Sequence, residues 1–153
     1  MRIWIVCAVL LAGITAFAQA GDMPGPDAEA LWTYITKTDP YCKWEYWPDH
    51  QGMQPGRSPH GPMHEIRVNH TAMVKGHPKQ AGAIVIKDNF SKEKKLLAVT
   101  VMYKIQDYNP MAGDWFWVKY GPDGTVLKAG KPKGCIACHG SRADMDYIMV
   151  SDH

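Results

Sequence analysis

Two cysteines three positions apart, followed at once by a histidine, constrain this 153-residue chain more than any other segment. They are Cys135, Cys138 and His139, and only fourteen residues follow them. This spacing is the attachment motif of c-type haem, in which two thiols form thioethers to the porphyrin edge and the histidine supplies an axial nitrogen to the iron. We therefore predict one covalently attached haem c on Cys135 and Cys138, with His139 as the iron ligand.

A cysteine pair of this spacing has three other uses: half of a zinc site, a thioredoxin-like redox pair or a structural disulfide. A zinc site of this kind usually includes a second Cys-x-x-Cys pair, which the chain lacks. A redox pair normally opens a helix after the first strand of a βαβ unit. Here the pair follows the last predicted strand, which favours haem attachment.

Residues 1–20 are typical of a secretory signal peptide. Arg2 gives the positive start, Ile3 to Phe17 form the apolar run, and Ala18-Gln19-Ala20 is a small-residue cleavage site. The run is too short for a comfortable membrane span, although an uncleaved anchor is the alternative. We expect a periplasmic or otherwise exported protein in which residues 21–153 form a single haem domain. Export agrees with the motif, because bacteria attach c-type haem outside the cytoplasm.

The formal net charge of +2 falls to +1 when Arg2 leaves with the signal. Nucleic acids and anionic membranes bind clustered Lys and Arg, and a weakly charged chain lacks that footprint. We expect no nucleic-acid partner and no membrane contact after signal cleavage. The five tryptophans and seven tyrosines of the mature chain suit either a small core or the walls of a flat cofactor pocket.

The hydrophobic pattern predicts an α+β fold, mainly an antiparallel five-stranded sheet with flanking helices. Asp27 is the expected N-cap of a helix that runs to about Lys37 and ends at Asp39-Pro40. Residues 41–62, rich in Pro, Gly and aromatics, predict an irregular packed segment. The strands are expected at 63–69, 83–87, 96–105, 114–120 and 125–129, the last two as a hairpin, with short helices near 70–76 and after Gly140.

The first of these strands carries polar side chains that could act on a bound molecule. Alternation places His64 on one side, and Glu65 and Arg67 on the other. A polar group above the iron could donate a hydrogen bond to a ligand or shuttle its protons. His64, Glu65 and Arg67 are therefore our candidates for the distal side, the side of the iron opposite His139. The alternative is that they are solvent-facing residues of a half-buried strand.

Most of the mature chain resembles the cytochrome P460 family and its relatives, the cytochromes c′-beta. The resembling segments occur in the family order: 44–48, 58–62, 83–87, 99–104, 113–117, 120–124 and the haem motif. The resemblance implies a largely antiparallel β fold, often dimeric, around a five-coordinate haem with an open distal face. It implies nitric oxide or a related small molecule as ligand, and in the P460 branch hydroxylamine oxidation.

The same resemblance implies two features of the P460 branch, a lysine bonded to the porphyrin edge and a distal carboxylate. We expect the lysine on or near the strand after His60-Gly61, but residues 63–69 contain none. The candidates for this lysine elsewhere in the region are Lys75, Lys79, Lys87 and Lys104. His60 lies in a family-like segment, where a structural role and a role at the haem are both open.

Two function classes follow. The first is a haem protein, and in one form a hydroxylamine-oxidising enzyme, that acts on small nitrogen species at an open iron. The second is an electron-transfer cytochrome with Met or His as a second axial ligand, a role open to Met102, Met111, Met145 and Met149, although methionine is more often a core filler. The redox partner protein is not identified. Cys42 is left unpaired and is expected to be buried as a small hydrophobic residue, with an intermolecular disulfide as the alternative.

Overall fold

The computed structural model describes residues 23–57 and 59–150, so the expected signal peptide at 1–20 lies outside the described residues. Its centre is one antiparallel sheet of seven strands in the order β1-β3-β4-β5-β6-β7, with β2 paired to β3. The α+β class is confirmed, but the sheet has seven strands where five were expected. The extra strands are β1 (Glu45–Tyr46) and β2 (Gln54–Pro55). Each has two residues and forms only by pairing with β3. A strand this short has no hydrophobic pattern in its own sequence that would predict it.

The longer strands form where β-branched and aromatic runs predicted them. The sheet pairs each strand with its neighbour along the chain, because the connections are short. Gly121, whose N–H donates to the carbonyl oxygen of Thr125 at 2.8 Å, closes the expected hairpin. These strands are β3 (Met63–Val68), β4 (Ile84–Phe90), β5 (Leu96–Lys104), β6 (Trp115–Tyr120) and β7 (Val126–Gly130).

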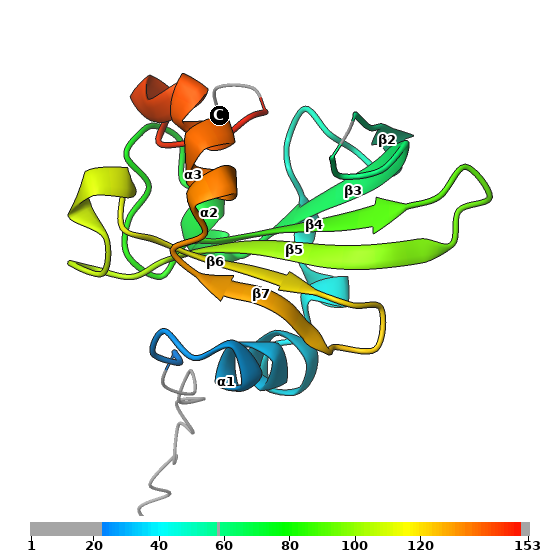
Figure 1. The fold of residues 1–153 in the computed structure, drawn as a ribbon, viewed down its shortest axis with the longest axis horizontal. Helices are drawn as coiled ribbons and strands as arrows, with labels where there is room; N and C mark the ends of the chain where they lie inside the picture. Colours follow the sequence, from blue (N-terminus) through cyan, green and yellow to red (C-terminus); the bar gives the residue numbers. More distant parts are fainter. Residues whose placement is uncertain (1–22, 58, 151–153) are drawn as a thin grey trace, which may run out of the picture.

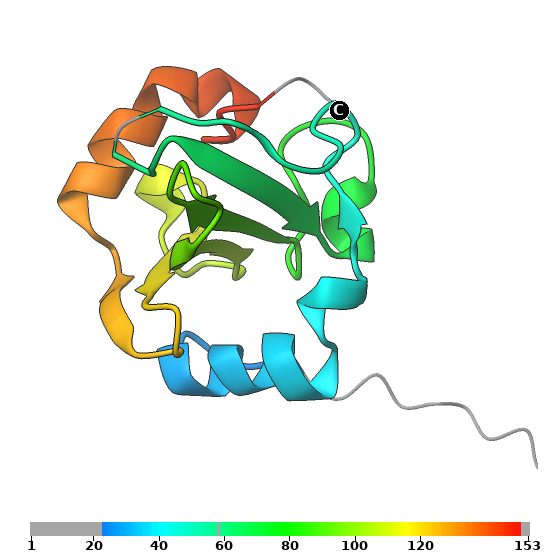
Figure 2. The ribbon, with the colours of Figure 1, turned by 90° about the vertical axis from the view of Figure 1, so that its right-hand side faces the viewer.

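Helices cover both faces of the sheet (Figures 1 and 2). On one face α1 (Ala28–Thr33) starts at Asp27, whose Oδ1 accepts from the backbone N–H of Ala30 at 2.7 Å, and continues as one π-helical segment, Tyr34–Thr38. The other face carries α2 (His70–Met73) and α3 (Lys133–His139), which leads into a 3-10 helix, Gly140–Met145. Further 3-10 turns lie at Tyr41–Lys43 and Pro110–Ala112.

Each face has its own hydrophobic core, and we call them the α1 face and the α3 face. Side chains alternate along each strand, so neighbouring residues belong to different cores. No helix within residues 23–57 and 59–150 is long and apolar enough to cross a membrane. The α1 face includes Leu31, Ile35, Ile84, Ile86, Val99, Phe116 and Tyr120, and the α3 face includes Trp47, Ile66, Val85, Met102, Trp115, Trp117 and Ile148.

The sequence predicts that Cys42 is buried, but in the structure it is exposed. It lies in the short turn Tyr41–Lys43, where the preceding Tyr41 takes the inward position and packs against the core of the α1 face. The hydroxyl of Tyr41 donates to Asp88 Oδ1 at 3.0 Å, which fixes that orientation. Its neighbour in this turn is therefore directed to solvent.

Candidate haem-binding site

Cys135, Cys138 and His139 all lie on α3, the helix that sequence patterning did not predict. Residues three and four positions apart share one face of an α-helix, so the two thiols and the imidazole project from the same side. Cys135 is half-buried and Cys138 is exposed, and neither forms a disulfide. Two unbonded thiols beside an imidazole on one helix face are the donor set that a c-type haem requires.

His139 is held in a defined orientation and tautomer. Its Nδ1 lies 2.8 Å from the carbonyl oxygen of Tyr147. A carbonyl oxygen only accepts, so Nδ1 carries the hydrogen and Nε2 keeps its lone pair. The ring of Trp117 packs edge-on against the imidazole, with ring centroids 4.7 Å apart. Burial lowers the pKa of His139, which favours the neutral ring that binds iron.

The acceptor of this hydrogen bond belongs to a segment that is anchored to the sheet. Asp146 and Tyr147 both have positive φ, +54° and +65°, in a tight bend after the 3-10 helix. The carboxylate of Asp146 is buried and receives the ammonium group of Lys104 at 2.6 and 2.7 Å. The backbone carbonyl oxygen of Asp146 accepts a hydrogen bond from Trp115 Nε1 at 2.8 Å. These contacts fix the carbonyl that orients His139.

His60 lies against His139 from a different part of the chain. The two ring centroids are 6.2 Å apart, with ring planes at 86°. His60 belongs to the loop between β2 and β3, which is closed by a 2.7 Å bond from the N–H of Gly56 to the carbonyl oxygen of Pro62. Burial, aided by the positive charge of Lys87, lowers the pKa of His60 to about 4. At neutral pH its ring is therefore uncharged.

His64 and Lys87 extend this group of basic side chains. His64 is only 6% exposed, and its two ring nitrogens have no hydrogen-bond partner within the described chain. Its ring stacks on His50 with centroids 5.7 Å apart. Burial and the charge of Lys87 lower the pKa of His64 to about 4.

Lys87 lies on β4 opposite Ile66 and Thr100. Alternation from Val85 directs its side chain to the α3 face. Burial lowers the pKa of Lys87, and its charge lowers the pKa of all three nearby histidines, His60, His64 and His139. Among the residues that the structure describes, no carboxylate forms an ion pair with Lys87.

Glu65 and Arg67 lie on the opposite face of the sheet from His64. Arg67 donates through Nη1 to the carbonyl oxygen of Trp44 at 2.9 Å and through Nη2 to the hydroxyl of Tyr46 at 2.6 Å. That hydroxyl donates to Glu65 Oε2 at 3.3 Å. Of the three distal candidates, the structure therefore brings only His64 to the side of the sheet that carries α3.

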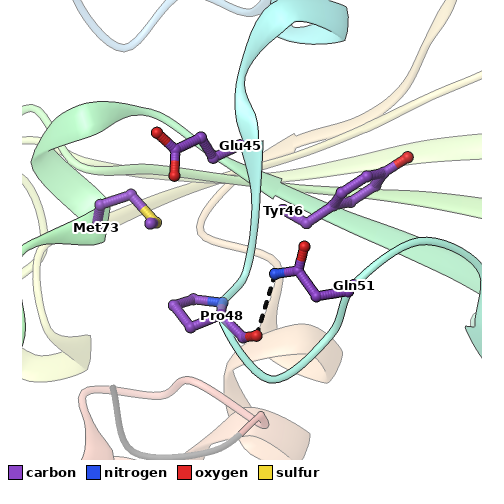
Figure 3. Close-up of a pocket in the computed structure, with 5 residues that line it drawn as sticks. All are labelled: Glu45, Tyr46, Pro48, Gln51 and Met73. Atoms are coloured by element: carbon purple, nitrogen blue, oxygen red, sulfur yellow. Dashed lines mark hydrogen bonds between the residues drawn. The ribbon is translucent and has the colours of Figure 1, made fainter.

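Two surface hollows border these elements. The larger, of about 560 Å³, lies beside β1 and is lined by Glu45, Tyr46, Pro48, Gln51 and Met73 (Figure 3). It contains neither cysteine nor histidine, so its chemistry does not match the haem motif. A smaller hollow, of about 190 Å³, borders His60, Asn89, Leu97 and Lys119 and lies beside the basic side chains described above.

Trp117 is a neighbour of His139 that the sequence did not place at the site, and Lys87 was one of four lysines that it left open. A signal for each was present. Lys87 alternates with Val85 in an otherwise apolar run, which puts a charge in a buried face, and Trp117 alternates with Trp115. Neither pattern alone reveals which helix covers that face.

The description of the family whose model matches the sequence is cytochrome P460, and the match covers residues 39–150. The span includes β1 to β7, α3 and every side chain that surrounds His139. No curated protein matches the sequence.

Proposed function

Because the chain belongs to the cytochrome P460 family, we propose that it is a c-type cytochrome that binds or oxidises small nitrogen species at its haem iron. Membership of this family implies a haem and its iron. Beyond that, the proposal has three parts: export through residues 1–20, attachment of one haem to Cys135 and Cys138, and reaction on the iron face opposite His139. Hydroxylamine and nitric oxide represent the proposed substrate class.

The local chemistry of α3 supports the attachment. Cys135 and Cys138 are unbonded thiols on the face of the helix that carries His139. The hydrogen bond to Tyr147 leaves Nε2 of His139 as the nitrogen for the iron. When bound, the haem supplies an iron that can hold a small molecule and exchange electrons.

The basic side chains around His139 support the proposal that a bound molecule reacts on the iron face opposite His139. His60 and His64 have a pKa of about 4, so each neutral ring can donate one hydrogen bond and accept another. Lys87 adds a positive charge that is not neutralised by a carboxylate of the described residues. Such groups stabilise negative charge on a bound nitrogen or oxygen atom and accept protons from hydroxylamine. An iron used only for electron transfer has no need of them.

Lys87 is our candidate for a cross-link to the porphyrin edge. The other lysines that sequence analysis left open have different partners or surroundings. Lys104 pairs with Asp146, the ammonium nitrogen of Lys79 donates to the carbonyl oxygen of Val74, and Lys75 is exposed. Only Lys87 of these four affects the pKa of His139.

Absorption spectroscopy with added ligand tests the proposed function. The purified ferrous protein should change its spectrum on addition of nitric oxide, and it should reduce an artificial electron acceptor when hydroxylamine is added. A double variant, Cys135→Ala with Cys138→Ala, provides the control that lacks covalent haem. A low-spin spectrum that neither nitric oxide nor carbon monoxide changes would exclude the proposal and indicate an electron-transfer cytochrome.

A further inference from the structure

Asn89 has a side-chain carbonyl oxygen that is buried without a hydrogen-bond partner among the residues that the structure describes. The residue is only 2% exposed. Its amide nitrogen Nδ2 donates to the carbonyl oxygens of Lys87 at 2.9 Å and Ala98 at 3.1 Å, and to Oγ1 of Thr100 at 3.2 Å. The hydroxyl of Thr100 gives its own hydrogen to the carbonyl oxygen of Lys87, so towards Asn89 it can only accept. The amide therefore cannot exchange its nitrogen and oxygen, and Oδ1 is a fixed hydrogen-bond acceptor.

His64 lies directly opposite Asn89 on the neighbouring strand. Residues that are directly opposite in an antiparallel pair project to one face, with their Cβ atoms about 5 Å apart. Asn89 follows Lys87 by two positions on β4, so both are directed to the α3 face. Both ring nitrogens of His64 are buried and lack a hydrogen-bond partner in the described chain. The pair thus places three buried polar atoms without partners at one point of the sheet.

The position of this pair indicates what could bind to it. Buried polar atoms without hydrogen bonds destabilise a fold unless another molecule binds them. Asn89 and His60 both line the smaller hollow, and the ring of His60 lies against that of His139. The atoms without partners are therefore next to the candidate haem-binding site rather than in a remote part of the core.

The donors and acceptors of the pair define the kind of molecule that fits. Oδ1 of Asn89 only accepts, whereas the neutral ring of His64 accepts at one nitrogen and donates at the other. A matching molecule must therefore bring at least two polar hydrogens and one lone pair. Hydroxylamine has hydrogens on both its nitrogen and its oxygen, and nitric oxide has none. The charge of Lys87, which lowers the pKa of His64, disfavours a cationic ligand at the same place.

We propose that Asn89 and His64 form a hydrogen-bonding subsite for a neutral molecule with N–H and O–H groups, and that this subsite favours hydroxylamine over nitric oxide. The inference rests on the proposed function, because it concerns molecules bound on the iron face opposite His139. Oδ1 of Asn89 accepts a hydrogen from the bound hydroxylamine, and the ring of His64 supplies the second acceptor and the donor. Because the subsite is buried, these hydrogen bonds are stronger than they would be in water. Asn89 and His64 thus determine specificity.

Two variants remove the subsite, and a matched third variant keeps it. His64→Phe retains a ring that can stack on His50 but removes both nitrogens. Asn89→Leu removes Oδ1, and Thr100→Val is its control, because it removes one partner of Nδ2 and leaves Oδ1 in place. Titration of the ferric protein with hydroxylamine, followed by optical absorption, gives the dissociation constant. We expect this constant to rise about tenfold in His64→Phe and in Asn89→Leu, and less than about threefold in Thr100→Val.

Nitric oxide should bind the ferrous form of all these proteins with the same affinity, because it brings no hydrogen to the subsite. His64→Phe should also unfold at the same urea concentration as the wild type or a higher one, since the lost nitrogens make no hydrogen bonds within the described residues. If Asn89→Leu does not fold, His64→Phe alone decides.

An unchanged hydroxylamine constant in the folded variants, or an equal loss of affinity for nitric oxide, would overturn the subsite. Unfolding of His64→Phe at a lower urea concentration would do the same, because it would show that the ring nitrogens hold the fold. A wild-type protein that binds neither nitric oxide nor hydroxylamine would overturn the proposed function instead, so the two failures are distinguishable.

Discussion

The ammonium nitrogen of Lys104 lies 2.6 Å from Oδ1 of Asp146, and both side chains are buried. The residue after Asp146 provides the carbonyl oxygen that accepts from Nδ1 of His139. The ion pair thus joins β5 in the sheet to the segment that orients the haem-binding histidine. A buried ion pair on the α3 face therefore fixes the segment that orients the histidine on α3.

Asp146→Asn should destabilise the protein by about 3 kcal/mol, because it leaves the Lys104 charge buried without its partner. Urea denaturation measures the loss in the free energy of unfolding. Asp144→Asn is the matched control, since Asp144 is exposed two residues earlier. Equal stability of the two variants would show that the ion pair does not anchor this segment.

Asp88 should make the fold less stable as pH rises. Burial raises its pKa to about 6, above the ordinary value of about 4. Between these two values the unfolded chain loses the proton while the folded protein keeps it, so the stability present at low pH falls and stays lower above about pH 6. Asp88→Asn is uncharged at every pH and can still accept from Tyr41.

At about pH 8, Asp88→Asn should raise the free energy of unfolding by about 2 kcal/mol, and near pH 4 it should have no effect. Urea denaturation at both pH values measures this difference. Asp107→Asn, which changes an exposed aspartate, controls for the loss of one negative charge. A gain of equal size at both pH values would contradict the assigned titration.

Covalent haem should depend on Cys135 and Cys138 but not on Cys42. Either Cys135→Ala or Cys138→Ala removes one thioether, and the double variant should lose all haem on denaturation. Cys42→Ala should keep it, because Cys42 is exposed in a turn on the other side of the sheet from α3. The intact mass of the denatured protein shows whether haem is still attached in each variant. Haem retained by the double variant would refute the assigned attachment.

Lys87→Met should lower the rate of hydroxylamine oxidation about tenfold or more, because it removes a positive charge that acts on all three histidines. Lys119→Met removes another lysine near His60 and should have a smaller effect. If Lys87 is bonded to the porphyrin, its replacement should also restore an ordinary c-type pyridine haemochrome. Equal rates in the two variants would remove Lys87 from the reactive face.

Local sequence patterns predicted the strands and helix starts that depend on residues close together in the chain. The β-branched runs gave β3 to β7 in the right order, and Asp27 marked the start of α1. The sequence did not reveal β1, β2 or α3. The two short strands exist only through pairing with β3, and α3 forms over Lys133–His139, where glycine and cysteine give a weak helical pattern.

The surroundings of His139 were the least predictable part of the site. His60 and His139 are 79 positions apart, and Lys87 reaches the same face from a third element. Strand alternation correctly separated His64 from Glu65 and Arg67, but it could not tell which side of the sheet α3 would cover. That choice depends on tertiary packing around Trp117 and Ile148.

A small nitrogen species should bind the haem iron on the face opposite His139. A titration of the ferrous protein with nitric oxide, followed by optical absorption, tests it most directly. We predict a saturable change from the spectrum of the resting protein to that of a nitrosyl complex. An absorption spectrum that stays unchanged at every concentration of nitric oxide would contradict this binding.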